Sequence, residues 1–197
     1  MKLNWAERLV VNNPLRVLEQ RLELHWFRRM ISLKPGFAAL EIGCGRGAGA
    51  GLILQELKPS YIHATDLDVE MLKKAKKYLS SEKRQTISLC AADVSNLPIK
   101  TNSLDAVFGF GVIHHALDWR ISLSEVARVL RPGGIYCIEE LYPALYQNFI
   151  TKHILLHPDG NRFRSSDLRH TLTQVRLDLK NSIECPWLGL LGVAVKE

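Results

Sequence analysis

Four glycines fall within the stretch ALEIGCGRGAG (39–49), directly after an apolar run. Glycine lets a chain turn tightly and lets backbone N–H groups approach a ligand closely. A helix that begins after such a turn adds a partial positive charge, which suits a carboxylate or a phosphate. The stretch therefore predicts a ligand-binding loop between a strand and a helix.

Two ligand classes fit this loop. Gly43, Gly45 and Ala48 satisfy a dinucleotide pattern of the G-x-G-x-x-A kind, and Asp66 is placed to accept the ribose of NAD. However, acids end three successive expected strands, at Glu41, Asp66 and Asp93. A carboxylate next to a pyrophosphate is repelled, whereas a carboxylate next to an ammonium group is attracted. The acids favour a nucleoside with a cationic tail over a dinucleotide.

The elements that must position these acids alternate along the chain. Apolar runs predict strands at 37–42, 61–65, 86–92, 104–110 and 135–138, and helical spacing predicts helices at 47–57, 69–79 and 121–130. This alternation predicts an α/β fold with a mostly parallel sheet and helices on both faces. A helix over 165–174 and a final strand pair at 175–183 and 190–195 predict an antiparallel edge, with Ser165 or Ser166 as the helix cap.

The first 34 residues show a helical pattern. Asn13-Pro14 is typical of a helix start, and Lys34-Pro35-Gly36 of its end. Apolar residues repeat between them at steps of three and four: Leu15, Leu18, Leu22, Trp26 and Met30. We expect a single domain over 1–197, made of an N-terminal helical cap (1–34), a binding core (35–140), a substrate-side insertion (141–164) and a final helix with two strands (165–197).

Five motifs in order resemble the class I S-adenosylmethionine-dependent methyltransferases: ALEIGCGRGAG, HATDLD, AADVSNLP, LDAVFGFGVIHH and RPGG. The resemblance covers about residues 35–140 motif by motif. It implies a Rossmann-like, doubly wound, seven-stranded sheet of order 3-2-1-4-5-7-6, with strand 7 antiparallel. It also implies S-adenosyl-L-methionine as cofactor and S-adenosyl-L-homocysteine as product.

The resemblance also implies roles for residues around the methionine part of the cofactor. Gly43, Gly45 and Gly47 would form the loop against the methionine and ribose. Glu41 would lie beneath that loop and orient the amino-acid end. The alternative for Glu41 is an acceptor for nearby backbone N–H groups. Two residues after the fourth strand would line the methionine side: Phe110 and Gly111.

The nucleoside part of the cofactor would be held by two further pairs. Asp66 would accept the two ribose hydroxyls, and Leu67 would pack against the adenine. Asp93 would take the adenine amine, and Val94 would donate its backbone N–H to the ring. Asp93 has an alternative reading as the cap of the following turn, because aspartate often accepts backbone hydrogen bonds there.

The acceptor side is less defined. His114 and His115 follow the fourth strand, where enzymes that methylate DNA amines carry an Asn/Asp-Pro-Pro-aromatic motif. The pair resembles small-molecule members, including the ubiquinone/menaquinone methyltransferases. Either histidine is a candidate general base near neutral pH, and packing is the alternative. Glu139 and Glu140 are further candidates. Aromatic residues available for the substrate walls are Trp5, Trp26, Phe27, Tyr142, Tyr146 and Phe149.

Bulk properties favour a cytoplasmic enzyme without a metal. His153 and His157 lack a clear third metal ligand, and the four cysteines form no CxxC pair. No run reaches the ~18 apolar residues that span a bilayer, and the start lacks the apolar core of a secretory signal. The net charge of +6 allows a nucleic-acid or anionic-membrane partner. The lysines within 73–77 are nevertheless read mainly as a solvated helix face.

The sequence thus predicts a methyltransferase that acts on a small-molecule acceptor. Three alternatives remain open: an RNA or protein methyltransferase recruited by the basic face, a catalytically silent binding module that acts through a partner, and a nicotinamide oxidoreductase.

Overall fold

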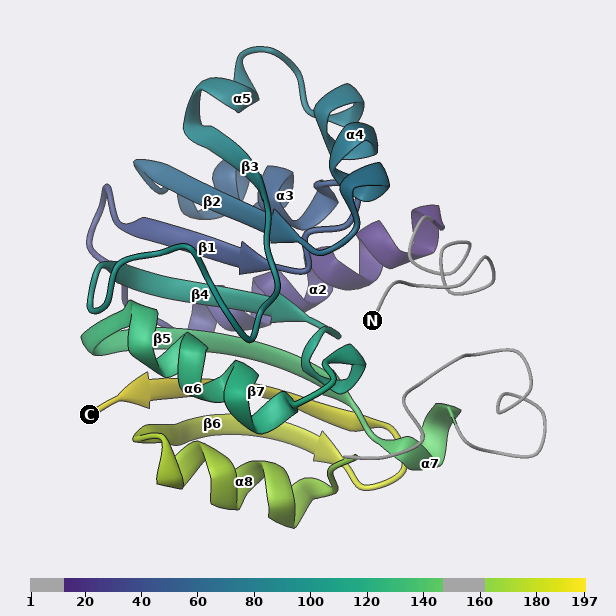
Figure 1. Ribbon diagram of the computed structural model, residues 1–197, viewed down its shortest axis with the longest axis vertical. Coiled ribbons are helices and arrows are strands. Elements are labelled where there is room, and N and C mark those ends of the chain that lie inside the picture. Colours follow the sequence, from purple (N-terminus) through teal and green to yellow (C-terminus); the bar gives the residue numbers. More distant parts are fainter. Residues whose placement is uncertain (1–12, 147–161) are drawn as a thin grey trace.

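A seven-stranded sheet organises the molecule (Figure 1). The computed structural model describes residues 13–146 and 162–197. The strand order is β3-β2-β1-β4-β5-β7-β6, and β7 pairs antiparallel with both β5 and β6. The predicted fold class and strand order are therefore confirmed. The strands are β1 (Ala38–Ile42), β2 (Tyr61–Asp66), β3 (Ile87–Ala91), β4 (Leu104–Phe110), β5 (Leu130–Leu141), β6 (Leu177–Cys185) and β7 (Gly189–Lys196).

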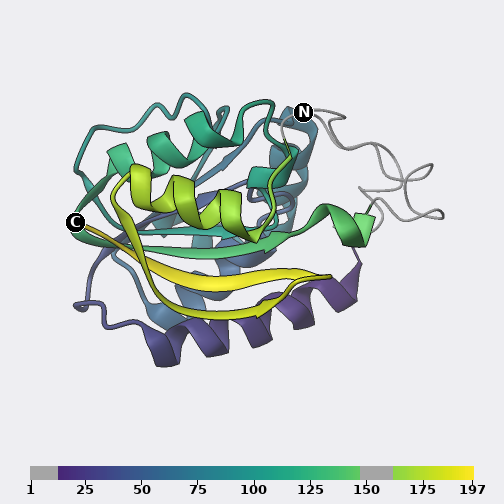
Figure 2. The same cartoon turned by 90° about the horizontal axis from the view of Figure 1, so that it is seen from below.

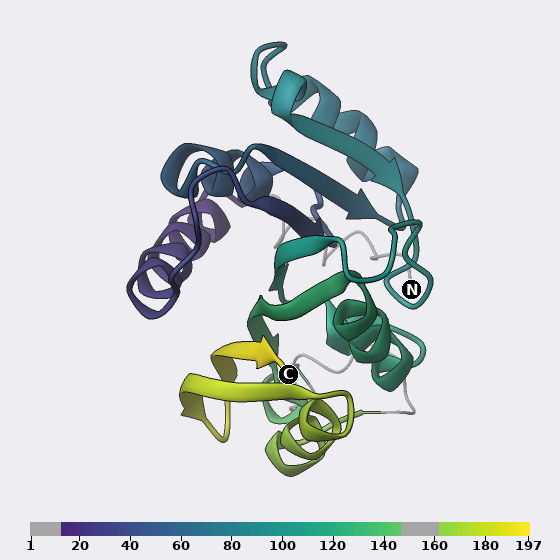
Figure 3. The ribbon, with the colours of Figure 1, turned by 90° about the vertical axis from the view of Figure 1, so that its left-hand side faces the viewer.

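Helices cover both faces of this sheet (Figures 2 and 3). On one face α6 and α8 bury Trp119, Leu123 and Leu168 against the strands. On the other face α2 and α3 bury Phe27 and Ile53. The helices are α2 (Pro14–Met30), α3 (Ala48–Leu57), α4 (Val69–Tyr78), α5 (Lys83–Thr86), the 3-10 helix η1 (Ile113–His115), α6 (Trp119–Val129), α7 (Pro143–Tyr146) and α8 (Ser165–Gln174).

The caps explain where several helices begin. The Asn13 side chain accepts a hydrogen bond from the Leu15 N–H and Pro14 opens α2, as predicted. The Asp118 side chain caps α6, which therefore begins two residues earlier than the predicted start at 121. Helix α8 follows Arg164, whose N–H donates to Asp167, so neither Ser165 nor Ser166 is its cap. The short helix α5 was not predicted.

Helix α2 packs with a different face from the one that its leucine repeat marks. Its buried residues are Glu23, Leu24 and Phe27. The repeated residues Leu15 and Leu22 are 70% and 64% exposed. The repeat correctly predicted the helix, but these leucines point away from the sheet. Helix α2 packs instead through Leu24 and Phe27, which lie about a third of a turn or more around the helix from the leucine repeat.

A matched pair of substitutions tests this orientation. We expect Leu24→Ala to lower the free energy of unfolding by about 2–5 kcal/mol, because it removes a fully buried side chain. The neighbouring Leu22→Ala should change it by less than about 0.5 kcal/mol, since its side chain is mostly exposed. Urea denaturation followed by circular dichroism measures both. Equal losses for the two variants would contradict this packing of α2.

Candidate functional site

A cleft lies at the carboxyl ends of the parallel strands, the edge at which open α/β sheets bind ligands. It holds about 840 Å³ of empty volume, part of it open to solvent. The lining residues are Gly43, Gly45, Thr65, Asp66, Leu67, Asp68, Met71, Ala92, Asp93, Val94, Phe110, Gly111, Val112, His115, Ala116 and Leu117. Most of the predicted cofactor-contacting residues thus lie around one cavity.

The glycine loop turns sharply between β1 and α3. Gly43, Gly45 and Gly47 all have positive φ, at 61°, 53° and 82°. A Cβ atom at position 43 would lie 2.5 Å from a methyl group of Val112, so a side chain there would clash. Gly43 and Gly45 line the cleft. Gly47 does not line it, because the site of its missing side chain faces Leu79, the residue after α4, at 3.1 Å.

Asp66 ends β2 with its carboxylate against the glycine loop. One oxygen accepts a hydrogen bond from the Gly45 N–H and the other from the Asp68 N–H, each at 2.8 Å. Burial raises the pKa of this carboxyl above its ordinary value. Carboxylate oxygens have lone pairs for more than one donor, so the group can also accept hydroxyl groups from the cleft. Leu67 lines the cleft beside it.

Asp93 and Val94 line the cleft beyond the end of β3. One oxygen of Asp93 accepts hydrogen bonds from the N–H and the hydroxyl of Ser95, at 2.9 and 2.6 Å. The turn-capping alternative for Asp93 is therefore present in the structure. It is compatible with a ligand contact through the second oxygen.

Glu41 lies beneath the glycine loop and is 1% exposed. A Cβ atom at position 49 would lie 2.0 Å from its Oε1 atom, so only glycine leaves room for this carboxylate. The Oε2 atom has no hydrogen-bond partner among the described residues. Burial raises the pKa of Glu41 to about 8. A buried, partnerless carboxylate oxygen is costly, and a cationic group in the loop would offset that cost.

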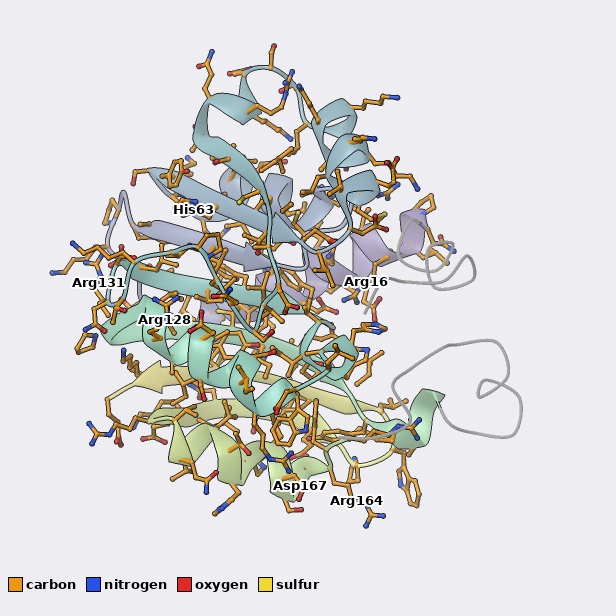
Figure 4. All side chains as sticks on the ribbon, in the orientation of Figure 1. Arg16, His63, Arg128, Arg131, Arg164 and Asp167 are labelled. Carbon is orange, nitrogen blue, oxygen red and sulfur yellow. The ribbon has the colours of Figure 1, made fainter. Side chains whose placement is uncertain are left out.

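A charged cluster that the sequence analysis missed joins α2 to the end of β5. The guanidinium of Arg16, which is labelled in Figure 4, lies 2.7 Å from Glu139 Oε2 and 3.0 Å from Glu23 Oε1. Burial raises the pKa values of both glutamates above their ordinary range. Glu139 also lies beside Gly111, where a Cβ atom would be 3.2 Å from its Oε2. The sequence signalled this cluster only through Arg16 and Glu23, two opposite charges seven residues apart on one face of α2.

The two histidines occupy different environments. His115 lines the cleft, whereas His114 is 8% exposed behind Gly111. The Nδ1 atom of His114 lies 2.7 Å from Glu140 Oε2. The fully buried Glu140 carboxylate also accepts the backbone N–H groups of residues 112, 113 and 114. Glu140 therefore fixes the η1 turn and favours the His114 tautomer with its proton on Nδ1.

The expected aromatic walls are only partly described. Phe27 and Tyr142 pack into the two hydrophobic cores and do not line the cleft, which corrects that expectation. Trp26 packs edge-on against Phe27, as the packing alternative held. Trp5, Phe149, His153, His157 and the side chain of Tyr146 lie outside the described residues. Within 13–146 and 162–197, no group of three His, Cys, Asp or Glu side chains could hold a metal ion.

Comparison with known proteins identifies the family. The model of a family described as "Methyltransferase domain" matches residues 40–138. The chain belongs to this methyltransferase family. The match runs from β1 to β5 and so includes the glycine loop, the strand-end acids and the histidine pair. The resemblance seen in the sequence is confirmed.

Relatives of this methyltransferase extend the comparison. It is 31% identical over 128 residues to a sterol 24-C-methyltransferase of Gibberella zeae, covering 63% of this chain and 33% of the relative. It is 31% identical over 144 residues to a demethylmenaquinone methyltransferase of Corynebacterium urealyticum, covering 72% of this chain and 58% of the relative. The chain thus spans between a third and somewhat more than half of these curated relatives.

The fold of this methyltransferase also matches a solved structure over its full length. A SAM-dependent methyltransferase from Aquifex aeolicus superposes with a TM-score of 0.74 at 16% identity, with all of both chains covered. At that identity the likeness concerns the fold alone.

The buried acid beneath the loop generates a stability prediction. The pKa of Glu41 is raised from its ordinary 4.5 to about 8 in the folded protein. Its contribution to stability is therefore fully present below pH 4.5 and is lost as the pH rises through 8. We expect Glu41→Gln to unfold at higher denaturant than the parent at pH 8.5, by about 1–2 kcal/mol, because the neutral amide has no charge to desolvate. At pH 4.5 the difference should shrink.

The matched control is Glu82→Gln, which removes a carboxylate from an exposed position. This variant should follow the parent protein at both pH values. A loss of stability in Glu41→Gln at pH 8.5 would contradict the desolvation argument, because it would mean that the ionised form is well satisfied in the fold.

Proposed function

We propose that this chain is an S-adenosylmethionine-dependent methyltransferase that acts on a small apolar acceptor. The observation that carries the proposal is the partnerless buried oxygen of Glu41 beneath a loop that only glycine can form. The cofactor has a cationic amino-acid end, two ribose hydroxyls and an adenine. The described residues offer a complementary group for each of these parts.

Each part of the cofactor has a proposed partner along the cleft. The Glu41 carboxylate would attract the ammonium group through the glycine loop. Asp66 would accept the ribose hydroxyls, with Leu67 against the adenine. Asp93 and Val94 would hold the edge of the ring. Phe110 and Gly111 would line the path towards the acceptor.

Alignment is the main task of the protein in this reaction. When bound, the cofactor supplies a methyl group on a sulfonium, whose bonding electron pair stays with sulfur as the methyl leaves. Holding acceptor and methyl in line can supply about 7–11 kcal/mol of the barrier. The packed end of β4 and the glycine loop would fix one partner, and the wall at Gly111 would place the other.

The nature of the acceptor is argued from the surroundings of the cleft and from the relatives. Two relatives are named for a sterol and for demethylmenaquinone, which are both apolar. The cleft mouth in this chain carries apolar side chains, including Leu67 and Leu117. An apolar acceptor would displace water from these groups on binding.

His114 is proposed as the general base where the acceptor atom must lose a proton. Glu140 holds its Nδ1, so the lone pair lies on Nε2. The neighbouring Cε1 is 3.5 Å from the place of a Cβ atom at Gly111, a residue of the cleft wall. As the acceptor atom forms its bond to the methyl carbon, its proton would pass to Nε2. His115 would contact the cofactor side.

One observation favours an RNA substrate as the second candidate. The lysines Lys73, Lys74, Lys76 and Lys77 of α4 form a basic groove with Arg84. A groove of this kind could bind phosphates in a salt-dependent manner. The Asn/Asp-Pro-Pro-aromatic motif of base-amine methylation is replaced here by Gly109-Phe110-Gly111-Val112, which makes this candidate the weaker one.

Calorimetric titration tests the cofactor directly. We expect micromolar binding of S-adenosylhomocysteine and no binding of NADH, because Glu41 disfavours a pyrophosphate in the loop. Asp66→Ala should weaken S-adenosylhomocysteine by about 1.5–3 kcal/mol, since a carboxylate acceptor is lost. Asp178→Ala, on the distant strand β6, is the control and should bind like the parent. Binding of NADH alone would overturn the proposal.

The pH dependence of the rate tests the base. With a demethylmenaquinone or a sterol as trial acceptor, kcat of the parent should fall at acid pH, because a protonated imidazole cannot accept the proton of the acceptor. We expect His114→Ala to lower kcat by about 10²–10⁴-fold and to remove that dependence. His115→Ala should mainly raise the KM for the cofactor. A pH-independent kcat in the parent would contradict the role of His114 as general base, while leaving the cofactor assignment intact.

A further inference from the structure

Large apolar side chains are exposed along the edge of the sheet at which the cleft opens. Leu15, Leu117 and Trp187 are 70%, 74% and 75% exposed, and Leu67 and Leu188 are 40% and 51% exposed. We call these five residues the apolar rim. They come from four separate segments of the chain. Soluble proteins seldom gather exposed apolar side chains unless the surface binds something.

Hydrogen bonds, strand pairing and the lining of the cleft place these four segments on the same edge. Leu117 lines the cleft itself. Leu67 directly follows the end of β2. Leu188 accepts a hydrogen bond from the Tyr142 N–H at 2.9 Å, so the β6–β7 turn lies at the end of β5. Leu15 precedes Arg16, which reaches Glu139 on β5. Figure 1 shows the start of α2 and the β6–β7 turn at the edge towards which β1 points.

The apolar rim continues along α2. Leu18 and Leu22 follow Leu15 at one and two turns and are 55% and 64% exposed. They lie on the side of the helix away from its buried residues Leu24 and Phe27. The helix is therefore apolar on both sides, although only one side packs within the fold. Because α2 runs from the end of β5 back towards the start of β1, only the Leu15 end of this stripe lies at the edge where the cleft opens.

A basic surface flanks the apolar rim. Helix α4 begins with Val69, 49% exposed and two residues from Leu67, and continues into Lys73, Lys74, Lys76 and Lys77, all exposed. We call these four residues the lysine face. Within this face, Lys73 forms an ion pair with Glu70 at 2.7 Å. Lysines beside an apolar surface complement the phosphates of anionic lipids.

We propose that the apolar rim and the lysine face dock this protein on an anionic lipid bilayer, with the cleft mouth turned towards the membrane. The indole of Trp187 would lie at the headgroup level, where tryptophan is favoured. An acceptor dissolved in the bilayer would reach the cleft without crossing water. This last step rests on the proposed apolar acceptor, whereas the docking itself does not. Among the described residues, no helix is long and apolar enough to span a bilayer.

The position of the rim argues against a second copy of this chain as the occupant. A dimer formed through the apolar rim would press two cleft mouths together and exclude the acceptor from both. A bilayer covers the same apolar side chains and leaves a source of apolar ligand at the mouth. The basic charge of the lysine face would repel its own copy but attract lipid phosphates.

Vesicle flotation of the full-length protein tests the proposal. We expect co-flotation with phosphatidylcholine vesicles containing phosphatidylglycerol, and much less with phosphatidylcholine alone. Binding should weaken at high salt because the lysine attraction is screened. Trp187→Glu and Leu15→Glu should each reduce the partition coefficient by about tenfold or more, since a charge replaces an apolar contact.

The matched control is Met30→Glu, an exposed apolar residue at the other end of the helix that carries Leu15. It should float like the parent. All three variants should keep the parent affinity for S-adenosylhomocysteine, because none of the residues lines the cleft. If the parent itself does not bind S-adenosylhomocysteine, the proposed function is refuted. Flotation, in contrast, tests only the docking on lipid.

Three results would overturn the docking proposal. One is the absence of co-flotation of the parent with anionic vesicles. Another is equal loss in Met30→Glu and the rim variants, which would mean a non-specific effect of charge. The last is a parent dimer in sedimentation velocity that Trp187→Glu dissociates, because the apolar rim would then be an interface between copies.

Discussion

The carboxylate of Glu41 occupies the space that a side chain at position 49 would need, and much of the site depends on that fit. The 2.0 Å separation leaves glycine as the only residue for position 49. A second close approach, between Gly43 and Val112, brings the glycine loop against the segment after β4. Two strands and a helix start therefore meet with almost no side-chain volume between them. Part of the loop's backbone holds the turn itself, because the Cys44 N–H donates to the Thr65 carbonyl and the Gly45 N–H to the Asp66 carboxylate.

The same edge of the sheet concentrates buried charge. Glu41, Glu23 and Glu139 are all desolvated, and burial raises the pKa values of all three. Arg16 supplies the balancing charge for two of them from a helix outside the glycine motif. A cationic ligand in this region would restore favourable interactions that the fold by itself lacks. The cost of desolvating these carboxylates is thus consistent with a site that binds a positively charged group.

Polar and apolar groups occupy different parts of the site. Buried acids and the glycine loop lie beneath the cleft, whereas exposed leucines and Trp187 lie along the edge of the sheet at which it opens. Helix α2 contributes to both, because Arg16 reaches inward while Leu15 points outward. One helix thereby links the charged interior of the site to the surface through which an apolar acceptor would arrive.

The sequence by itself determined the order of the elements, the glycine loop and the acids at the strand ends. These features follow from local rules, since apolar periodicity, glycine and helix caps act within a few residues. The tertiary structure decided which face of α2 is buried and which partners the charged residues take. Arg16 and Glu139 are separated by 123 residues, and His114 and Glu140 by 26. Only the folded sheet brings such groups within hydrogen-bonding distance, because no local pattern records which distant side chain will lie opposite a given position.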